Sequence, residues 1–325
     1  MSQTASCFHI HELGLPCIAD ILPFHPTSPH SIHQSNLNSP TQLTMAVTED
    51  SPWTYLAFHH DGDLHTLPTR VKSVKPLTEL EDANKQLFKI TEESEAGPLH
   101  VVVTKATVFH PQGGGQPSDE GEMISEDGSA KFTVTAVRTD VVTNGQVLHL
   151  GHFTTTSHFT PGTTVTQTLD VEKRQLYSRL HTAGHVLGSA VRHLVESSIP
   201  GFDELKASHF PSSASCEFKG SIEGKWKEPI QARVDEYVEK DMPVEIEWWT
   251  EQDFKDNGME RLVPDKGFLA PGEEKFRVVR IRGAEVYPCG GTHVHGTKGC
   301  GKTTVKKISR SKGVSRVSYT VDGAT

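Results

Sequence analysis

Long apolar runs are missing from this 325-residue sequence, in which hydrophobic residues make up only 35%. No stretch approaches the roughly 18 consecutive apolar residues that a membrane-spanning helix needs. We therefore expect no transmembrane helix and no membrane partner. The length is sufficient for one large hydrophobic core and favours two.

Cysteine is scarce, with five residues in an odd-numbered set. We find no secretory signal that would place the chain in an oxidising compartment, where cysteines pair as disulfides. We therefore expect reduced cysteines and a cytoplasmic location, with Cys289 as a metal thiolate. The other cysteines are Cys7, Cys17, Cys216 and Cys300, of which the last two are expected to pack rather than react.

Lysine and arginine are absent from residues 1–44, which are rich in Ser, Pro and Thr and contain five histidines. Such a composition buries too little apolar surface to offset the entropy of ordering, so it predicts a disordered low-complexity tail. A mitochondrial transit peptide would be arginine-rich, and the lack of basic residues argues against one.

Positive charge is the minority sign overall, because the formal net charge is -9. This balance argues against a protein that wraps nucleic acid over its whole surface. Residues 298–316 are the exception, with seven basic residues and no acidic one. We interpret this segment as a candidate phosphate-facing surface, with an ordinary solvated face as the alternative.

The periodicity of the sequence changes near residue 170. Residues 45–170 contain short β-segments between Gly, Pro and Asp-Gly turns, which predict a small β-barrel-like domain. Residues 171–325 combine helical spacing with strand-like segments, which predicts an α+β domain with a mainly antiparallel sheet. The predicted helices are 174–195 and 229–241, and the predicted strands are 99–104, 131–137, 146–150, 163–169, 215–218, 244–249, 278–282, 303–308 and 314–321.

A candidate metal site combines two short motifs. His181 and His185 are four residues apart in the predicted helix, so both imidazoles lie on one face, one turn apart. Cys289 and His293 flank a Gly-Gly-Thr turn, whose glycines allow both side chains to fold inward. Three imidazoles and one thiolate suit Zn²⁺, which is borderline-soft and binds both ligand types. We expect one zinc ion per chain.

Thr182 follows the first histidine of the helical pair, where zinc peptidases carry their glutamate base. This residue therefore disfavours a zincin protease. A purely structural zinc would also be satisfied by four protein ligands, so these residues alone leave structural and catalytic roles open. His193 and His295 are expected to be ordinary surface or packing residues, because the site already has four donors.

Three consecutive glycines, Gly113, Gly114 and Gly115, lie in the segment FHPQGGGQPSDEG. Glycine allows positive φ and close approach by a ligand. A ligand-facing loop and a tight barrel turn both explain the run. The letters Gly-Gly-Gln at 114–116 also occur in peptide release factors, but three residues are too few to support an inference.

In order, FHPQGGGQPSDEG, RLHTAGHVL and CGGTHV resemble the AlaX-type alanyl-tRNA editing proteins over roughly residues 85–325. These are free-standing relatives of the alanyl-tRNA synthetase editing domain, which is also related to one in threonyl-tRNA synthetase. The resemblance implies a cytosolic, ATP-independent, zinc-dependent hydrolase with a barrel-like and an editing domain. Its substrate would be tRNA(Ala) mischarged with serine or glycine, with no obligate protein partner. It implies His181, His185, Cys289 and His293 as zinc ligands, Gly113, Gly114 and Gly115 near the substrate, and Lys306, Lys307, Arg310 and Lys312 on tRNA phosphates.

The sequence departs from the synthetase pattern at Gly184, where threonine typically precedes the second histidine. Selection of serine over alanine needs a polar group for the seryl hydroxyl, so the departure leaves its identity open. We expect Thr182 as the replacement and Thr182 and Gln116 as the catalytic residues. No carboxylate stands out as general base, and zinc could activate water, polarise the carbonyl or only position the substrate. The alternative is a non-catalytic RNA-binding or regulatory protein that keeps this fold with a structural zinc.

Overall fold

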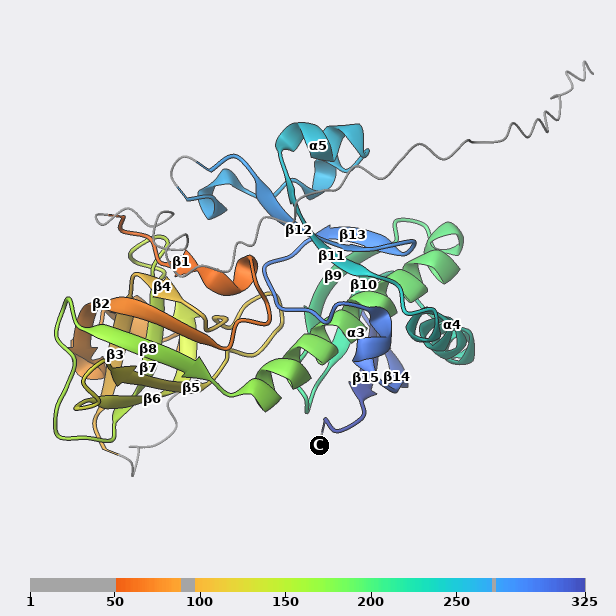
Figure 1. Ribbon diagram of the computed structural model, residues 1–325. Helices are drawn as coiled ribbons and strands as arrows, with labels where there is room; N and C mark the ends of the chain where they lie inside the picture. Colours follow the sequence, from red (N-terminus) through yellow and green to blue (C-terminus); the bar gives the residue numbers. More distant parts are fainter. Residues whose placement is uncertain (1–50, 89–96, 271–272, 325) are drawn as a thin grey trace, which may run out of the picture. The chain divides into compact units, whose positions relative to one another are not determined.

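The computed structural model describes residues 51–88, 97–270 and 273–324. The chain from residue 46 onward forms one compact unit, in which Figure 1 follows the elements from a barrel to a mixed α and β part. The predicted tail, residues 1–44, lies outside the described residues.

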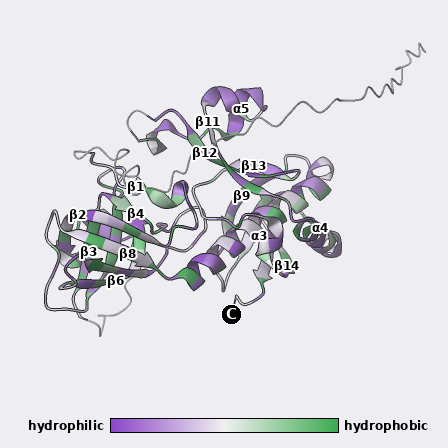
Figure 2. Ribbon diagram, in the orientation of Figure 1, coloured by the Kyte–Doolittle hydropathy of each residue, from purple (hydrophilic) through white to green (hydrophobic). Residues whose placement is uncertain are grey.

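Six antiparallel strands close into a barrel in the order β2-β3-β7-β6-β5-β8 (Figure 1). Inward side chains such as Val102, Phe132 and Val165 are fully buried. Figure 2 shows apolar residues concentrated along these strands. The prediction of a β-barrel-like region is confirmed. The strands are β2 (Thr66–Pro76), β3 (Leu99–Thr104), β5 (Gly121–Ser125), β6 (Lys131–Thr139), β7 (Val147–Phe153) and β8 (Thr164–Leu169).

Strand β2 was not predicted from the sequence. Its buried positions alternate at Leu67, Thr69 and Val71, and exposed polar residues and Pro68 stand between them. Proline is tolerated there because β3 pairs with β2 only from Val71 onward, so no strand on that side requires a backbone donor at Pro68. Next to the barrel, β1 (Tyr55–Leu56) pairs in parallel with β4 (Ala106–Thr107), and α2 (Asp82–Lys85) forms a single turn.

The long helix α3 spans Val171–Val195. Asp170 caps it by accepting a hydrogen bond from the Lys173 N–H at 3.1 Å, so the helix begins earlier than its apolar period predicts. Helix α4 (Lys227–Glu239) packs against α3 and carries Pro229 in its first turn, where no backbone donor is lost. Among the described residues, no helix is long and apolar enough to cross a membrane.

Two antiparallel sheets complete this part of the chain, in the orders β14-β15-β10-β9 and β11-β12-β13 (Figure 1). Buried side chains of α3, α4 and the four-stranded sheet form one hydrophobic cluster. The predicted α+β class is confirmed. The strands are β9 (Asp203–Ser208), β10 (Ser215–Lys219), β11 (Val244–Trp249), β12 (Phe276–Ile281), β13 (Glu285–Pro288), β14 (Thr303–Ser311) and β15 (Val314–Val321), with α5 (Glu251–Asp256) after β11.

Candidate metal centre

The structure brings the four predicted ligands together. His181 and His185 lie one turn apart on α3, and Cys289 and His293 follow β13. One donor atom from each of the four lies within 4.8 Å of the others. Cys289 Sγ is 3.5 Å from His181 Nε2 and 3.4 Å from His293 Nε2. A tetrahedral zinc site has Zn–S near 2.3 Å and Zn–N near 2.0 Å, which gives N···S edges of about 3.5 Å. The group therefore fits one metal ion.

Gln116 determines the tautomer of His181. The Gln116 side chain is fully buried. Its Oε1 accepts from the Thr292 N–H at 3.0 Å, and its Nε2 donates to Thr292 Oγ1 at 2.9 Å. These contacts identify Oε1 as the atom 2.6 Å from His181 Nδ1. Because an amide oxygen only accepts, His181 Nδ1 carries the proton and Nε2 is left for a metal.

The other two imidazoles are held in the same way. His185 Nδ1 lies 2.6 Å from the Glu285 carboxylate, which accepts its proton. Thr182 Oγ1 donates to the Ser178 carbonyl at 2.9 Å and accepts from His293 Nδ1 at 3.1 Å. All three rings therefore present Nε2 as the free donor atom, which is the arrangement that metal-binding histidines require.

The glycines of the turn allow its close approach to α3. A Cβ at Gly291 would lie 2.1 Å from His181 Cε1 and 2.7 Å from Gln116 Oε1. The Gly291 N–H also donates to Cys289 Sγ at 3.4 Å, which stabilises the thiolate. A side chain at this position would separate Cys289 from the helical pair.

Burial and neighbouring groups set the protonation of the ligands. Burial, followed by the nearby imidazoles, lowers the pKa of His181 and of His293 well below the usual value. Burial disfavours the charged forms of Cys289 and His185, but the contact between these two side chains outweighs the effect of burial. The Glu285 carboxylate also favours the charged form of His185. The Cys289 pKa is consequently lowered and the His185 pKa raised. Metal binding would displace the proton shared by this thiolate–imidazolium pair.

The glycine-rich loop carries Gln116 into the centre. Gly113 and Gln116 pair across a tight turn in which Gly114 and Gly115 have φ values of 54° and 81°. A Cβ on Gly115 would lie 2.4 Å from the Ala207 carbonyl oxygen of β9. The run therefore serves both a tight turn and a close backbone approach. Contact of the loop with a substrate stays a prediction.

A buried ion pair that the sequence did not predict joins the barrel to α3. Arg174 and Asp119 side chains are 2% and 0% exposed. Arg174 Nε donates to Asp119 Oδ1 at 3.0 Å, and the remaining guanidinium donors reach the carbonyls of Val108 and Gly62 at 2.7 and 2.9 Å. Because Asp119 follows Gln116 in the same motif, the pair also anchors the loop that holds His181.

Two further residues adjoin the centre without having been predicted, Glu285 and His209. The His209 ring stacks on that of His181, with centroids 4.4 Å apart and 25° between the planes. Neither residue belongs to a local motif, so no spacing in the sequence could have identified it.

The predicted phosphate-binding residues lie on a different element from the metal ligands. Lys306, Lys307 and Arg310 are exposed on β14, an edge strand, and Lys312 is exposed in the turn that follows it. A bulge between Val305 and Lys307 turns two successive lysines outward. In the described part of the chain, none of these four basic residues forms an ion pair.

Residues set aside as ligands have other surroundings. His295 is exposed beside Asp63, and His193 Nδ1 lies 2.6 Å from the Tyr237 hydroxyl. Cys216 and Cys300 are buried, and burial raises the pKa of the Cys300 thiol to about 12 and that of Cys216 further. The first two cysteines of the chain lie outside the described residues.

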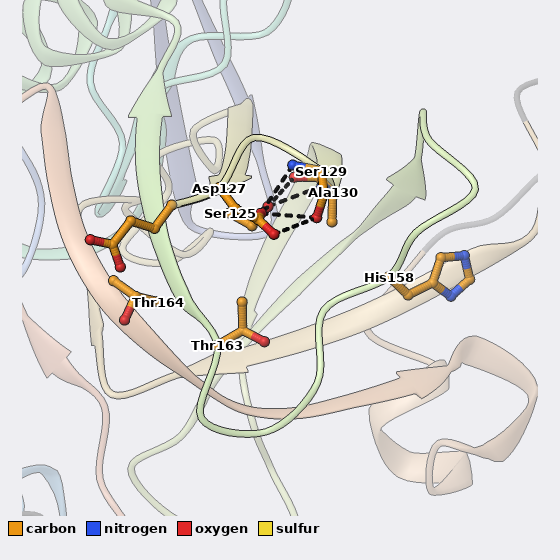
Figure 3. Close-up of a pocket in the computed structure, with 8 residues that line it drawn as sticks. Ser125, Asp127, Ser129, Ala130, His158, Thr163 and Thr164 are labelled. Atoms are coloured by element: carbon orange, nitrogen blue, oxygen red, sulfur yellow. Dashed lines mark hydrogen bonds between the residues drawn. The ribbon is translucent and has the colours of Figure 1, made fainter.

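A separate cavity of about 520 Å³ opens on the barrel. Figure 3 shows hydrogen bonds that join Ser125, Asp127 and Ser129 at the β5–β6 turn, with Thr163 and Thr164 nearby. Asp127 accepts from the Ser125 hydroxyl at 2.6 Å and the Ser129 N–H at 3.0 Å. The Asp127 carboxylate is therefore already hydrogen-bonded to residues of its own turn. None of the site residues predicted from the sequence lines the cavity. The metal centre is therefore the stronger candidate site.

Comparison with known protein families gives two matches. Residues 54–173 match "tRNA synthetases class II (A)", and residues 276–318 match "Threonyl and Alanyl tRNA synthetase second additional domain". The first match contains the glycine-rich loop, and the second contains Cys289 and His293.

The individual proteins to which the chain is similar include alanyl-tRNA editing proteins and alanine–tRNA ligases. The chain is 29% identical over 220 residues to the alanyl-tRNA editing protein AlaX-L of Pyrococcus horikoshii and 27% over 242 residues to AlaX-M of Methanosarcina barkeri. It is 32% identical over 229 residues to alanine–tRNA ligase 1 of Lachnoclostridium phytofermentans. These alignments cover 67%, 74% and 69% of the chain. They span 50% of AlaX-L, 96% of AlaX-M and 24% of the ligase.

The closed barrel, the antiparallel α+β part and the His/Cys group, together with these matches, make the chain similar to the editing domains of alanyl-tRNA synthetases. Among such proteins it resembles the AlaX-type alanyl-tRNA editing proteins, as its motifs predicted.

Proposed function

We propose that this protein hydrolyses the ester of tRNA(Ala) mischarged with serine, and also with glycine, at a zinc-containing centre. The observation that carries the proposal is the ligand group: three imidazoles with Nδ1 already occupied, and one cysteine, within 4.8 Å. Its occurrence in a chain similar to proteins named alanyl-tRNA editing proteins supports an ester of alanine tRNA as the substrate.

A zinc ion held by these ligands would supply a Lewis acid or a water of lowered pKa. The chain's own contribution is to orient the ligands. Gln116, Thr182 and Glu285 each accept the Nδ1 proton of one imidazole. We therefore assign Gln116 and Thr182, expected from the sequence as catalytic residues, as positioning residues that act through His181 and His293.

The acceptor end of the tRNA is assigned to the basic edge strand and the glycine-rich loop. Lys306, Lys307 and Arg310 project from β14 with no carboxylate bound to them in the described part of the chain, so they are available to phosphates. Gly114 is exposed and its backbone N–H is open to a ligand, whereas the N–H of the exposed Gly113 donates to the Gln116 carbonyl within the turn.

We place the protein in the cytoplasm, with tRNA(Ala) as its macromolecular partner. Cys216, Cys289 and Cys300 are all unpaired, which agrees with a reducing compartment.

Deacylation of purified Ser-tRNA(Ala), Gly-tRNA(Ala) and Ala-tRNA(Ala) by the zinc-loaded protein tests the proposal. We expect rapid loss of the seryl ester and slow loss of the alanyl ester. His185→Ala should lower both zinc content and hydrolysis. Binding of tRNA with intact zinc and no loss of any ester would contradict hydrolysis and favour an RNA-binding protein with a structural metal.

A further inference from the structure

Gly184 makes room for a histidine beside the metal centre. A Cβ at this position of α3 would lie 2.3 Å from Cε1 and 2.5 Å from Nδ1 of His209, and 2.7 Å from the Tyr319 hydroxyl. Such separations are too short for real side chains, so any other residue at 184 would displace the imidazole. The departure from the synthetase pattern therefore has a physical reason: His209 fills the space that a side chain at 184 would occupy.

Tyr319 determines which nitrogen of His209 carries the proton. The Tyr319 hydroxyl donates its single proton to the Leu180 carbonyl at 2.8 Å and lies 2.7 Å from His209 Nδ1. Nδ1 must therefore donate to Tyr319, which leaves Nε2 as the acceptor of a neutral ring.

Nε2 of His209 has no partner among the described residues. In that part of the chain only the Ser189 hydroxyl is fully buried without a partner, so Nε2 keeps access to solvent. The His209 ring lies between two parts of the candidate site. It stacks on His181 at 4.4 Å, and a Cβ on Gly115 would lie 3.1 Å from its Cδ2. An unused acceptor thus adjoins both a metal ligand and the glycine-rich loop.

We propose that His209 Nε2 accepts a hydrogen bond from the hydroxyl of a seryl ester and thereby selects serine over alanine. The inference rests on the proposed function and names the specificity residue of that site. An alanyl group has no donor for Nε2, so its binding would leave the acceptor desolvated and unpaired. Thr182, expected as the hydroxyl reader, is already engaged with Ser178, His293 and Val294.

Two substitutions in the full-length, zinc-loaded protein test this role. Single-turnover deacylation is compared on Ser-tRNA(Ala) and Ala-tRNA(Ala), whose aminoacyl groups differ only by the hydroxyl. In His209→Ala and in Gly184→Ala we expect the Ser:Ala rate ratio to fall by about tenfold. Each variant would lose the hydrogen bond that favours the seryl ester and the unpaired acceptor that disfavours the alanyl ester. Zinc content and melting temperature are measured for each variant.

Gly188→Ala is the matched control, because it lies one turn further along the same helix. The atoms nearest to its Cβ would be those of the Glu204 carboxylate, at an ordinary contact distance of 3.5 Å. We expect this variant to keep the wild-type Ser:Ala ratio. A fall equal to that of Gly184→Ala would attribute the effect to the helix and overturn the role of His209.

The outcomes separate this inference from the function on which it rests. If the wild type cleaves Ser-tRNA(Ala) but His209→Ala lowers both rates alike with intact zinc, His209 does not select serine and the hydrolase assignment stands. If the zinc-loaded wild type cleaves neither ester, the proposed function falls and this inference with it. Should His209→Ala lose zinc, Tyr319→Phe decides, because it keeps the ring but releases Nδ1. Its Ser:Ala ratio must also fall, and an unchanged ratio overturns the proposal.

Discussion

Gln116 acts on the metal centre through a single amide oxygen. Its replacement by alanine should weaken zinc binding by about 10- to 100-fold, because His181 would lose the acceptor that keeps the proton on Nδ1. Competition against a chromophoric chelator measures the affinity. Gln112→Ala changes an exposed glutamine of the same loop and should leave zinc affinity unaltered. Equal affinities for the two variants would show that Gln116 does not support the ligand.

At the residue scale, the four ligands were predictable because each pair is local in the chain. His181 and His185 share a helical face, and Cys289 and His293 share a turn. Their supporting residues were not predictable from pattern alone. Glu285 and His209 meet these ligands only through the packing of β13 and of the segment after β9 against α3, which no period in the sequence records.

At the scale of elements, apolar strands were predicted with their observed bounds, as for Leu99–Thr104, Val244–Trp249 and Val314–Val321. The strands that were missed, such as β2 and β9, have polar or exposed residues at many positions. Their pairing partners, rather than their own side chains, keep them extended. Helix α3 begins before the predicted first residue for a related reason. Its N-cap, Asp170, is polar and does not belong to the apolar pattern from which the helix was predicted.

Strand β7 contributes a pH-sensitive element to the barrel core through His149. Its Nδ1 donates to the Val102 carbonyl at 2.9 Å, so its Nε2 accepts from the Thr107 hydroxyl at 2.8 Å. Burial lowers the pKa of His149 to about 4. An unfolded histidine titrates near 6.5, so the unfolded chain takes up the proton first as pH falls. The stability from the neutral ring is complete above about pH 6.5 and is lost toward pH 4.

We therefore expect the His149 contribution to unfolding free energy to fall by about 2 kcal/mol between pH 7 and pH 5. Urea unfolding of the wild type and of His149→Gln at both pH values measures it, because glutamine keeps a donor and an acceptor without titrating. The stability difference between these two proteins should shrink at the lower pH. His152→Gln, on the same strand but only half-buried, is the control. A difference independent of pH would refute the role of His149.

At the scale of the whole molecule, the Arg174–Asp119 pair joins the barrel to α3. Removing one partner leaves the other charge buried and unpaired. Arg174→Met and Asp119→Ala should therefore each lower the free energy of unfolding by about 3 to 5 kcal/mol. Lys131→Met breaks a half-exposed pair on the barrel, with Glu122, and should cost less than about 1 kcal/mol. Urea denaturation compares the three variants. Similar small losses in all three would mean that the buried pair does not tie the two parts together.

The charge distribution of the whole molecule determines how it should bind tRNA. With a net charge of -9, the chain offers phosphate-binding surface only where basic residues cluster, as on β14. Lys307→Ala should weaken tRNA(Ala) binding and reduce the slope of log affinity against log salt concentration by roughly one, since one counterion fewer is released. Fluorescence anisotropy over a salt series measures both quantities. Lys255→Ala removes an exposed lysine from α5 and should leave the slope unchanged. If the two variants have the same slope as the wild type, the phosphates lie on another face, and the basic strand is only a solvated edge.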